Sequence, residues 1–289
     1  MGRYRYLDAI GGAQTSVQDW GGQLQKDDEM YRSIRSAALA ALFFSGTAGA
    51  QAEDSMAKPT VVLVHGAFAV SSGWNDVIAR LEKDGYPVIA AANPLRSVAG
   101  DAESVAAVVR SISGRVILVG HSYGGVVITE AAKGNANVKA LVFVAGFLPD
   151  TGESALTLSA KFPGSTLGEA LAPVSLPGGG TALYIQPAKF RAQFAADVPE
   201  AQAILMAATQ RPVTQGALTD TSQAATWKSL PTYVIYGAED RNIPAATMRF
   251  MADRAHARKT VSVANGSHAL MVSHPVEVAE LIENAASDR

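Results

Sequence analysis

A serine in the middle of the chain lies in the motif Gly-x-Ser-x-Gly, which is typical of an exposed nucleophile. Ser122 is flanked by Gly120 and Gly124, and the motif follows the apolar run Val116–Val119. That run predicts a buried strand, and the residues after the motif predict a helix. At a tight strand-to-helix turn a Cβ at either flanking position would collide with the backbone, and glycine avoids this. The motif also occurs by chance, but between a strand and a helix it predicts a serine displayed at the edge of a sheet.

An acid and a base follow the serine in the order that this chemistry requires. Serine alone is a poor nucleophile, so it needs a base within hydrogen-bond reach and a third group that orients the base. Asp240 comes just after the strand-like segment Thr232–Tyr236, and His268 lies in a loop after Thr260–Val263. We therefore predict that these two residues complete a catalytic triad. Glu239 is the alternative acid, and a structural loop aspartate with a solvent-exposed loop histidine is the alternative without catalysis.

Two backbone N–H groups are predicted to hold the oxyanion that forms when the serine attacks a carbonyl. One belongs to Tyr123, directly after the nucleophile, and the other to Ala67, in the loop after the first strand. Losing one such donor typically costs about 3 kcal/mol of transition-state stabilisation. A simple tight turn at Ala67 is the alternative. The side chains predicted to line an apolar substrate pocket, with ordinary core packing as the alternative, are Phe68, Trp74 and Met271.

The remaining composition excludes several other chemistries. The chain has no cysteine, which rules out disulfides, thiolate catalysis, Cys-ligated zinc and a lipoprotein anchor. No two of its five histidines have a metal-ligand spacing, so no metal site is predicted; His65 and His121 are expected to be hydrogen-bonded supports beneath the site. The net charge is −2 and the basic residues form no cluster, so no nucleic-acid or anionic-membrane partner is expected.

The elements that must position these residues alternate between strands and helices. Predicted strands are Thr60–Val64, Val88–Ala91, Val116–Val119, Val138–Val144, Thr232–Tyr236 and Thr260–Val263. Predicted helices cover Trp74–Lys83, Asp101–Ile112 with Asp101 as its N-cap, Tyr123–Lys133, Pro244–His256 and Pro275–Ala286. Strands separated by helices of this length predict an α/β fold, a doubly wound, mostly parallel sheet with helices on both faces.

One long segment, 151–230, interrupts this alternation. It contains no convincing buried strand, carries several prolines and the run Gly178–Gly180, and has helix-like stretches at Pro187–Phe194 and Pro199–Ala208. Eighty residues between two core strands are too many for a loop. We therefore predict a mainly helical cap over the strand ends, where doubly wound sheets bind ligands.

The first 52 residues are typical of a targeting segment preceded by an extension. From Met30 the chain has a basic start, a short apolar stretch at Ala37–Phe44 and a small-x-small cleavage site ending at Ala52. The apolar stretch is too short to span a bilayer, which takes about 20 residues. We predict that translation starts at Met30 and that cleavage follows Ala52, leaving a periplasmic or secreted domain at 53–289. A buried N-terminal helix in a cytoplasmic protein is the alternative.

Four motifs together give the chain a family resemblance. Val-Leu-Val-His-Gly-Ala-Phe at 62–68, Gly-His-Ser-Tyr-Gly-Gly at 120–125, Tyr-Gly-Ala-Glu-Asp at 236–240 and Gly-Ser-His at 266–268 resemble the α/β-hydrolase superfamily in order and spacing. Their details look most like bacterial esterase-like members near the branch of plant methyl esterases and hydroxynitrile lyases. The resemblance implies the same triad and oxyanion donors, no cofactor, and a small-molecule ester as substrate; a homodimer is compatible with it.

Departures from the plant branch favour ester hydrolysis. Hydroxynitrile lyases of that branch place a threonine where this chain has Gly66, and a lysine where it has Ala269. The lysine stabilises the departing cyanide, which alanine cannot do. We therefore expect a carboxylesterase acting through an acyl-enzyme on a small or medium ester. A hydroxynitrile lyase, a cofactor-free perhydrolase and a non-catalytic ligand-binding member remain the alternatives.

Overall fold

The predicted strands form one parallel sheet in the computed structural model, which describes residues 57–288. The order across the sheet is β2-β1-β3-β4-β8-β9, and every neighbouring pair is parallel. The strands are β1 (Thr60–Val64), β2 (Val88–Ala91), β3 (Val116–His121), β4 (Val138–Val144), β8 (Thr232–Gly237) and β9 (Lys259–Val263). The central strands are almost fully buried. Continuous apolar runs of this kind are expected where helices cover both faces.

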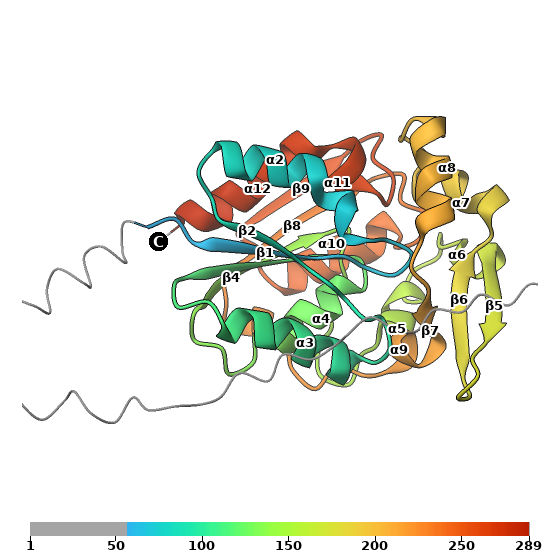
Figure 1. Ribbon diagram of the computed structural model, residues 1–289, viewed down its shortest axis with the longest axis horizontal. Coiled ribbons are helices and arrows are strands. Elements are labelled where there is room, and N and C mark those ends of the chain that lie inside the picture. Colours follow the sequence, from blue (N-terminus) through green and yellow to red (C-terminus); the bar gives the residue numbers. More distant parts are fainter. Residues whose placement is uncertain (1–56, 289) are drawn as a thin grey trace, which may run out of the picture. The chain divides into compact units, whose positions relative to one another are not determined.

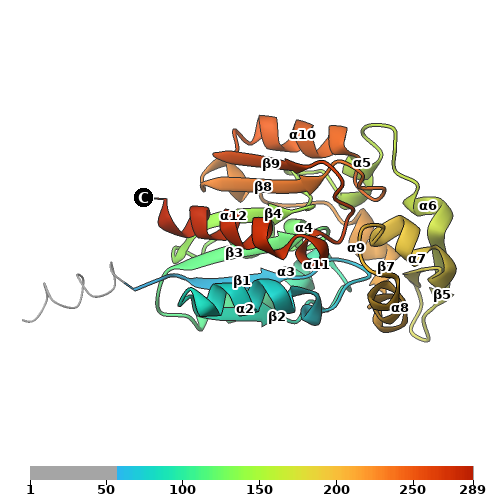
Figure 2. The ribbon, with the colours of Figure 1, turned by 90° about the horizontal axis from the view of Figure 1, so that it is seen from above.

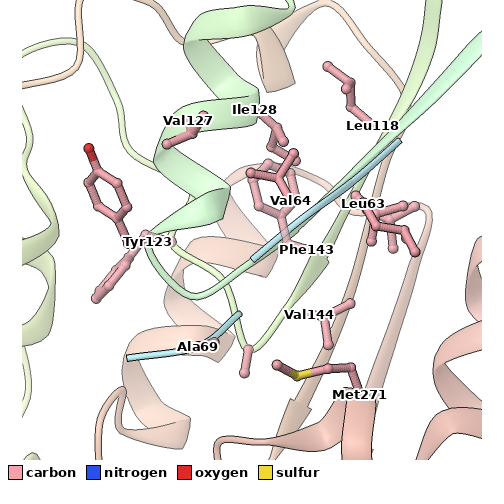
Figure 3. Close-up of a cluster of buried hydrophobic side chains, with 14 of the residues drawn as sticks. Leu63, Val64, Ala69, Leu118, Tyr123, Val127, Ile128, Phe143, Val144 and Met271 are labelled. Carbon is pink, nitrogen blue, oxygen red and sulfur yellow. The ribbon is translucent and has the colours of Figure 1, made fainter. Parts of the chain in front are cut away.

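Helices cover the two faces of the sheet, as the sequence predicts. In Figure 1, α2 (Asn75–Lys83) and α12 (Pro275–Ser287) lie on one face, and α3 (Val98–Arg110) and α4 (Gly124–Ala131) lie on the other. Figure 3 shows Val127 and Ile128 of α4 among buried side chains of the sheet such as Val64 and Phe143. The remaining core helices are η1 (Ser71–Trp74), α10 (Ala245–Arg254) and α11 (Leu270–Ser273). Within residues 57–288, no helix is both long and apolar enough to cross a membrane.

The start of α3 differs from the prediction. Ser97, not Asp101, is the N-cap, and its side chain accepts a hydrogen bond from the N–H of Gly100. Asp101 lies inside the first turn and is fully buried, where it accepts hydrogen bonds from the N–H of Arg96 and the hydroxyl of Tyr123. Both residues are good caps by type. Their tertiary contacts, which the local pattern does not contain, decide between them.

The cap segment lies over the carboxyl ends of the strands (Figures 1 and 2). Its helices are α5 (Ala155–Ser159), α6 (Leu167–Ala170), α7 (Pro187–Phe194), α8 (Glu200–Thr209), α9 (Gln215–Thr219) and η2 (Thr226–Lys228). An antiparallel sheet of β5 (Leu171–Ser175), β6 (Thr181–Ile185) and β7 (Val213–Thr214) joins them, which the sequence analysis does not predict. β5 is largely exposed and contains Pro173, and β7 has two residues, so neither carries a buried-strand pattern. β6 is mostly buried, so the prediction that this segment contains no buried strand is wrong there.

The order of the strands creates a switch point beside the predicted site. The chain moves from β1 outward to β2 and then returns to place β3 on the other side of β1. The loops after β1 and β3 therefore diverge, and ligands of open α/β sheets bind in the crevice between such loops. The loop after β1 contains Ala67, and the turn after β3 contains Ser122.

Candidate active site

The turn after β3 holds Ser122 in a left-handed backbone conformation, with φ of 55°. The flanking glycines make this turn sterically feasible. A Cβ on Gly120 would lie 2.5 Å from the carbonyl oxygen of Gly124, and a Cβ on Gly124 would lie 2.5 Å from that of Val64. The strand, tight turn and helix thus have the predicted arrangement, and the backbone strain is local to the nucleophile candidate.

Asp240 and His268 form a buried pair. The Nδ1 of His268 lies 2.7 Å from Oδ2 of Asp240, and both side chains are at most 1% exposed. The other carboxylate oxygen of Asp240 accepts hydrogen bonds from the N–H groups of Asn242 and Ile243, at 2.7 and 3.0 Å. A carboxylate can only accept here, so Nδ1 carries the proton and Nε2 presents its lone pair. This is the tautomer that a general base requires.

The free nitrogen of His268 lies at the same sheet edge as the serine. His121 precedes Ser122, and its Nε2 donates to the carbonyl oxygen of His268 at 3.0 Å. Among the described residues, no hydrogen bond joins Ser122 to His268, and Nε2 of His268 has no partner. Such contacts are often long before a substrate binds and tighten in the Michaelis complex.

The two predicted oxyanion donors come from adjacent strands. Val64 at the end of β1 pairs with Gly120 of β3, and Gly66 lies directly against Ser122, so the loop that carries Ala67 is adjacent to the turn that carries Ser122 and Tyr123. The neighbouring N–H of Phe68 donates to the carbonyl of Arg211 in the cap, at 3.0 Å. The N–H groups of Ala67 and Tyr123 make no hydrogen bond within the described residues, and that of Tyr123 lies at the start of α4, where an anion is favoured.

Two buried histidines support the loops that carry these donors. The N–H of Asn93 donates to Nε2 of His65, so the proton on Nδ1 of His65 is donated to the carbonyl of Gly66. His121 uses Nε2 as a donor and leaves Nδ1 without a partner. Burial lowers the pKa of His65 and lowers the pKa of His121 well below its usual value. Both rings are therefore neutral supports, as the sequence analysis expects.

A cavity of about 120 Å³ opens from the serine toward the cap. Its floor includes Ala67, Phe68, Ser122 and Tyr123, and its cap side consists mainly of apolar side chains from α5, α6, β5 and α9: Ala155, Leu156, Leu167, Leu171 and Leu218. Of the three predicted pocket residues, Phe68 lines this cavity, whereas Trp74 and Met271 do not. Trp74 is fully buried edge-on to His121, and Met271 packs in the core under the site (Figure 3). Aromatic and apolar type alone does not say which side of a loop a residue faces.

No group of three or more His, Asp or Glu side chains in residues 57–288 is arranged to hold a metal ion. A histidine oriented by a carboxylate, a serine at positive φ and two N–H groups without a partner in the described residues form an arrangement that can perform acyl transfer. Comparison with known proteins identifies the family of the chain. The model of the "Alpha/beta hydrolase family" matches residues 61–281, which is most of the chain.

The chain belongs to the alpha/beta hydrolase family. Among curated members, an alpha-hydroxynitrile lyase of Arabidopsis thaliana is 27% identical over 80% of this chain and 98% of its own length. A carbendazim hydrolyzing esterase of a Nocardioides species is 34% identical, over 35% of this chain and 47% of the relative. The crystal structure of polyneuridine aldehyde esterase superposes with a TM-score of 0.69, at 21% identity, over 78% of this chain and 98% of that one. The predicted likeness to the branch of plant esterases and hydroxynitrile lyases is confirmed.

Within this alpha/beta hydrolase, the structure also brings in residues that sequence reasoning missed. Asp197, between α7 and α8, accepts hydrogen bonds from both the hydroxyl and the N–H of Ser267, next to His268. Asn242 lines the cavity, two residues after the predicted acid. The proximity of Asn242 to Asp240 in the sequence is a signal that could have found it. Asp197 has no such signal, because 70 residues separate it from Ser267.

Proposed function

We propose that this alpha/beta hydrolase is a carboxylesterase in which Ser122, His268 and Asp240 form and hydrolyse an acyl-enzyme. The observation that carries the proposal is the buried Asp240–His268 pair, because it leaves the lone pair of Nε2 unpartnered at the sheet edge that displays the serine. The esterases among the relatives support the same class of reaction.

The mechanism follows from the atoms that each group presents. His268 takes the hydroxyl proton of Ser122 as Oγ attacks the ester carbonyl, and the N–H groups of Ala67 and Tyr123 stabilise the oxyanion. His268 then gives that proton to the leaving alcohol. Water enters, gives a proton to Nε2 and attacks the acyl-enzyme. His268 then returns this proton to Oγ of Ser122 as the acyl–oxygen bond breaks, which releases the carboxylic acid and restores the serine hydroxyl and the neutral base. Asp240 orients the imidazole ring and stabilises the imidazolium through both steps.

The experiment that tests this proposal is labelling with an organophosphonate. We expect wild-type protein to be labelled on Ser122 and to hydrolyse p-nitrophenyl esters, and the Ser122→Ala variant to lose labelling and nearly all turnover. Removing a triad nucleophile costs up to about a millionfold in kcat. Retained turnover in Ser122→Ala would contradict the mechanism, and stoichiometric acylation of wild-type protein without recycling would favour a ligand-binding member of the family.

The lack of space around Gly66 argues against lyase activity. A Cβ at this position would lie 2.5 Å from Cβ of Ser122 and 2.6 Å from the carbonyl of His121, so this backbone has no room for threonine. Ala269, the counterpart of the lyase lysine, is fully buried. We expect no release of cyanide from mandelonitrile, and enzymatic release would restore the lyase alternative.

We also propose that the enzyme works outside the cytoplasm, after cleavage behind Ala52. The support is the leader-like pattern that begins at Met30, which lies outside the described residues. Mass spectrometry of the native protein should find an N-terminus at Glu53. A peptide from residues 1–29 would contradict the assigned start.

A further inference from the structure

Besides the serine and the two N–H groups assigned to the oxyanion, the cavity under the cap contains one side-chain donor that the described residues leave unused. The hydroxyl of Tyr123 donates to Asp101, so apart from Ser122 the polar side chains to consider at its wall are Ser159, Ser165 and Asn242. The hydroxyl of Ser165 donates to the carbonyl of Asn242 at 2.9 Å, and that of Ser159 donates to the same oxygen at 3.4 Å. Both serine protons are therefore engaged with backbone, and only the side-chain amide of Asn242 remains.

A neighbouring glutamine fixes the orientation of that amide. Nε2 of Gln193 donates to the carbonyl of Arg241 at 2.9 Å, and a carbonyl can only accept, which identifies the amino end of Gln193. The same nitrogen lies 2.8 Å from the side chain of Asn242, so the Asn242 atom that faces it must be the acceptor Oδ1. The amino group, Nδ2, then faces away from Gln193 and has no partner in the described residues.

The environment of this amino group limits what it can bind. Asn242 is 3% exposed, and its backbone N–H is held by Asp240, so the side chain is placed rigidly next to the catalytic pair. Within residues 57–288, no lysine or arginine lines the cavity. A carboxylate would therefore lose its hydration without gaining a counter-charge, whereas a neutral oxygen needs a single donor.

We infer that Asn242 determines substrate specificity by donating a hydrogen bond from Nδ2 to a neutral oxygen on the otherwise apolar group that enters this cavity. The substrate class is an ester that carries a second, uncharged acceptor, such as an ether, a ketone or another ester carbonyl, near the ester that is cleaved. The inference rests on the proposed function and specifies its substrate. An all-hydrocarbon ester would leave Nδ2 desolvated and unpaired, which a buried donor tolerates poorly.

Matched pairs of substrates test this inference. In two series of esters, an ether oxygen replaces one methylene at successive positions, in the acyl chain of p-nitrophenyl hexanoate and in the alcohol chain of hexyl acetate. For each pair, the preference for the ether is the ratio of its kcat/KM to that of the hydrocarbon ester. At one position of the oxygen, this ratio should be about tenfold higher in wild type than in Asn242→Leu. Esters with a terminal carboxylate should be poor substrates of wild type and of Asn242→Leu alike.

Further variants separate loss of the donor from loss of the fold. Asn242→Asp keeps an acceptor for Gln193 but has no donor, so it should lose the ether preference as Asn242→Leu does. Ser165→Ala is the matched control at the same wall and should keep the preference, because the hydroxyl proton of Ser165 is engaged with backbone. Equal ether-to-hydrocarbon ratios in wild type and both Asn242 variants at every position would overturn the inference.

A binding measurement separates this inference from the proposed function. The affinity of Ser122→Ala for the same ester pairs is measured by calorimetry, with and without Asn242→Leu. If wild type hydrolyses no ester but the Ser122→Ala protein binds the ether more tightly through Asn242, the proposed function fails and the inference stands. If the esters are hydrolysed and neither rates nor affinities depend on Asn242, the inference fails and the function stands.

Discussion

The strained backbone at Ser122 is held by close contacts on three sides. Its own flanking glycines approach the backbone of neighbouring segments, and Gly66 of the β1 loop lies directly against its side chain. A non-glycine residue at positive φ carries a cost of about 1–3 kcal/mol, which the surrounding structure must offset. The position of Oγ relative to the oxyanion donors therefore depends on the small size of these neighbours.

Gly66→Ala should disable the enzyme more than it destabilises the fold. The added Cβ would have to lie 2.5 Å from Cβ of Ser122, so the serine turn or the oxyanion loop must shift. Misplacing a reacting group by about 1 Å can cost on the order of a hundredfold in rate, whereas overpacking typically costs about 1–3 kcal/mol of stability. Kcat/KM for a p-nitrophenyl ester and the free energy of unfolding in urea measure the two effects.

Gly216→Ala is the control for this variant. Gly216 lies in α9, and a Cβ there would meet no atom within 4 Å, so neither rate nor stability should fall. A Gly66→Ala enzyme with wild-type kcat/KM would show that this loop tolerates a side chain and that the steric argument is wrong.

Residue type together with position after a strand predicts which residues meet at the candidate site, but not which residues line its walls. Ser122, Asp240 and His268 can be named because each follows a strand, and the ends of parallel strands meet at one edge. Apolar type and nearness to the motifs predict Trp74 and Met271 in the pocket, yet both are buried in the core. Which way a loop side chain points depends on its tertiary neighbours, and a linear pattern does not contain them.

At the scale of elements, the cap holds the loop that carries His268, the base of the proposed mechanism. Asp197, in the link between α7 and α8, accepts hydrogen bonds from Ser267 and lies 3.4 Å from Nε2 of His274. Burial by itself would raise the pKa of Asp197, but the hydrogen bonds from the side chain and backbone of Ser267 outweigh it and lower the pKa. The carboxylate is therefore ionised at neutral pH and fixes the residue next to His268.

Asp197→Ala should lower kcat with little change in KM. The substitution leaves the N–H of Ser267 unpaired and frees the histidine loop, but Asp197 does not line the cavity. An unsatisfied buried donor costs about 1–3 kcal/mol, so a fall of about tenfold or more in kcat and in the rate of organophosphonate labelling is expected. Asp197→Asn keeps one acceptor and should recover part of the rate.

Glu200→Gln provides the comparison, since this exposed carboxylate lies three residues along the same segment. Unchanged kinetics in Glu200→Gln with slow labelling in Asp197→Ala would assign the effect to the contact with Ser267. A loss of thermal stability in Asp197→Ala with wild-type kcat would reduce the contact to a structural role.

How well an element can be predicted from the sequence depends on how much of it is buried. The four central strands follow from their sequences because strands buried on both faces must be continuous apolar runs. The edge strands β2 and β9 are half-buried or exposed, and they follow from their β-branched residues. In the cap sheet β6 is mostly buried, whereas β5 is paired but largely exposed and its residues carry no burial pattern. The hairpin of β5 and β6 is closed by Gly179 and Gly180 at positive φ, so the glycine run forms a turn between two strands.

At the scale of the whole molecule, the two buried histidine supports tie the stability of the fold to pH. A second proton on His65 would break the hydrogen bond from the N–H of Asn93, and one on His121 would place a charge on an unpartnered buried nitrogen. Burial lowers the pKa of both rings in the folded protein. In the unfolded chain both rings bind a proton near pH 6.5.

The protein should therefore lose stability as the pH falls below about 6.5, by up to about 1.4 kcal/mol per pH unit for each histidine. The sign follows because the unfolded chain binds more protons than the folded one in this range. Asp101 acts in the opposite sense, since burial raises its pKa, so a variant is needed to isolate the histidine effect.

His121→Phe keeps an aromatic ring among Trp74 and Phe194 but binds no proton. It should be less stable than wild type at pH 8, because the carbonyl of His268 loses its donor, a loss of about 1–3 kcal/mol. Between pH 6.5 and 5 its free energy of unfolding should fall less steeply than that of wild type, so the two curves converge on acidification. Urea unfolding at half-unit pH steps measures the stability difference at pH 8 and the two slopes below pH 6.5. Parallel curves would mean that His121 takes up its proton in the folded protein, and the support beneath the nucleophile would then have to include a charge.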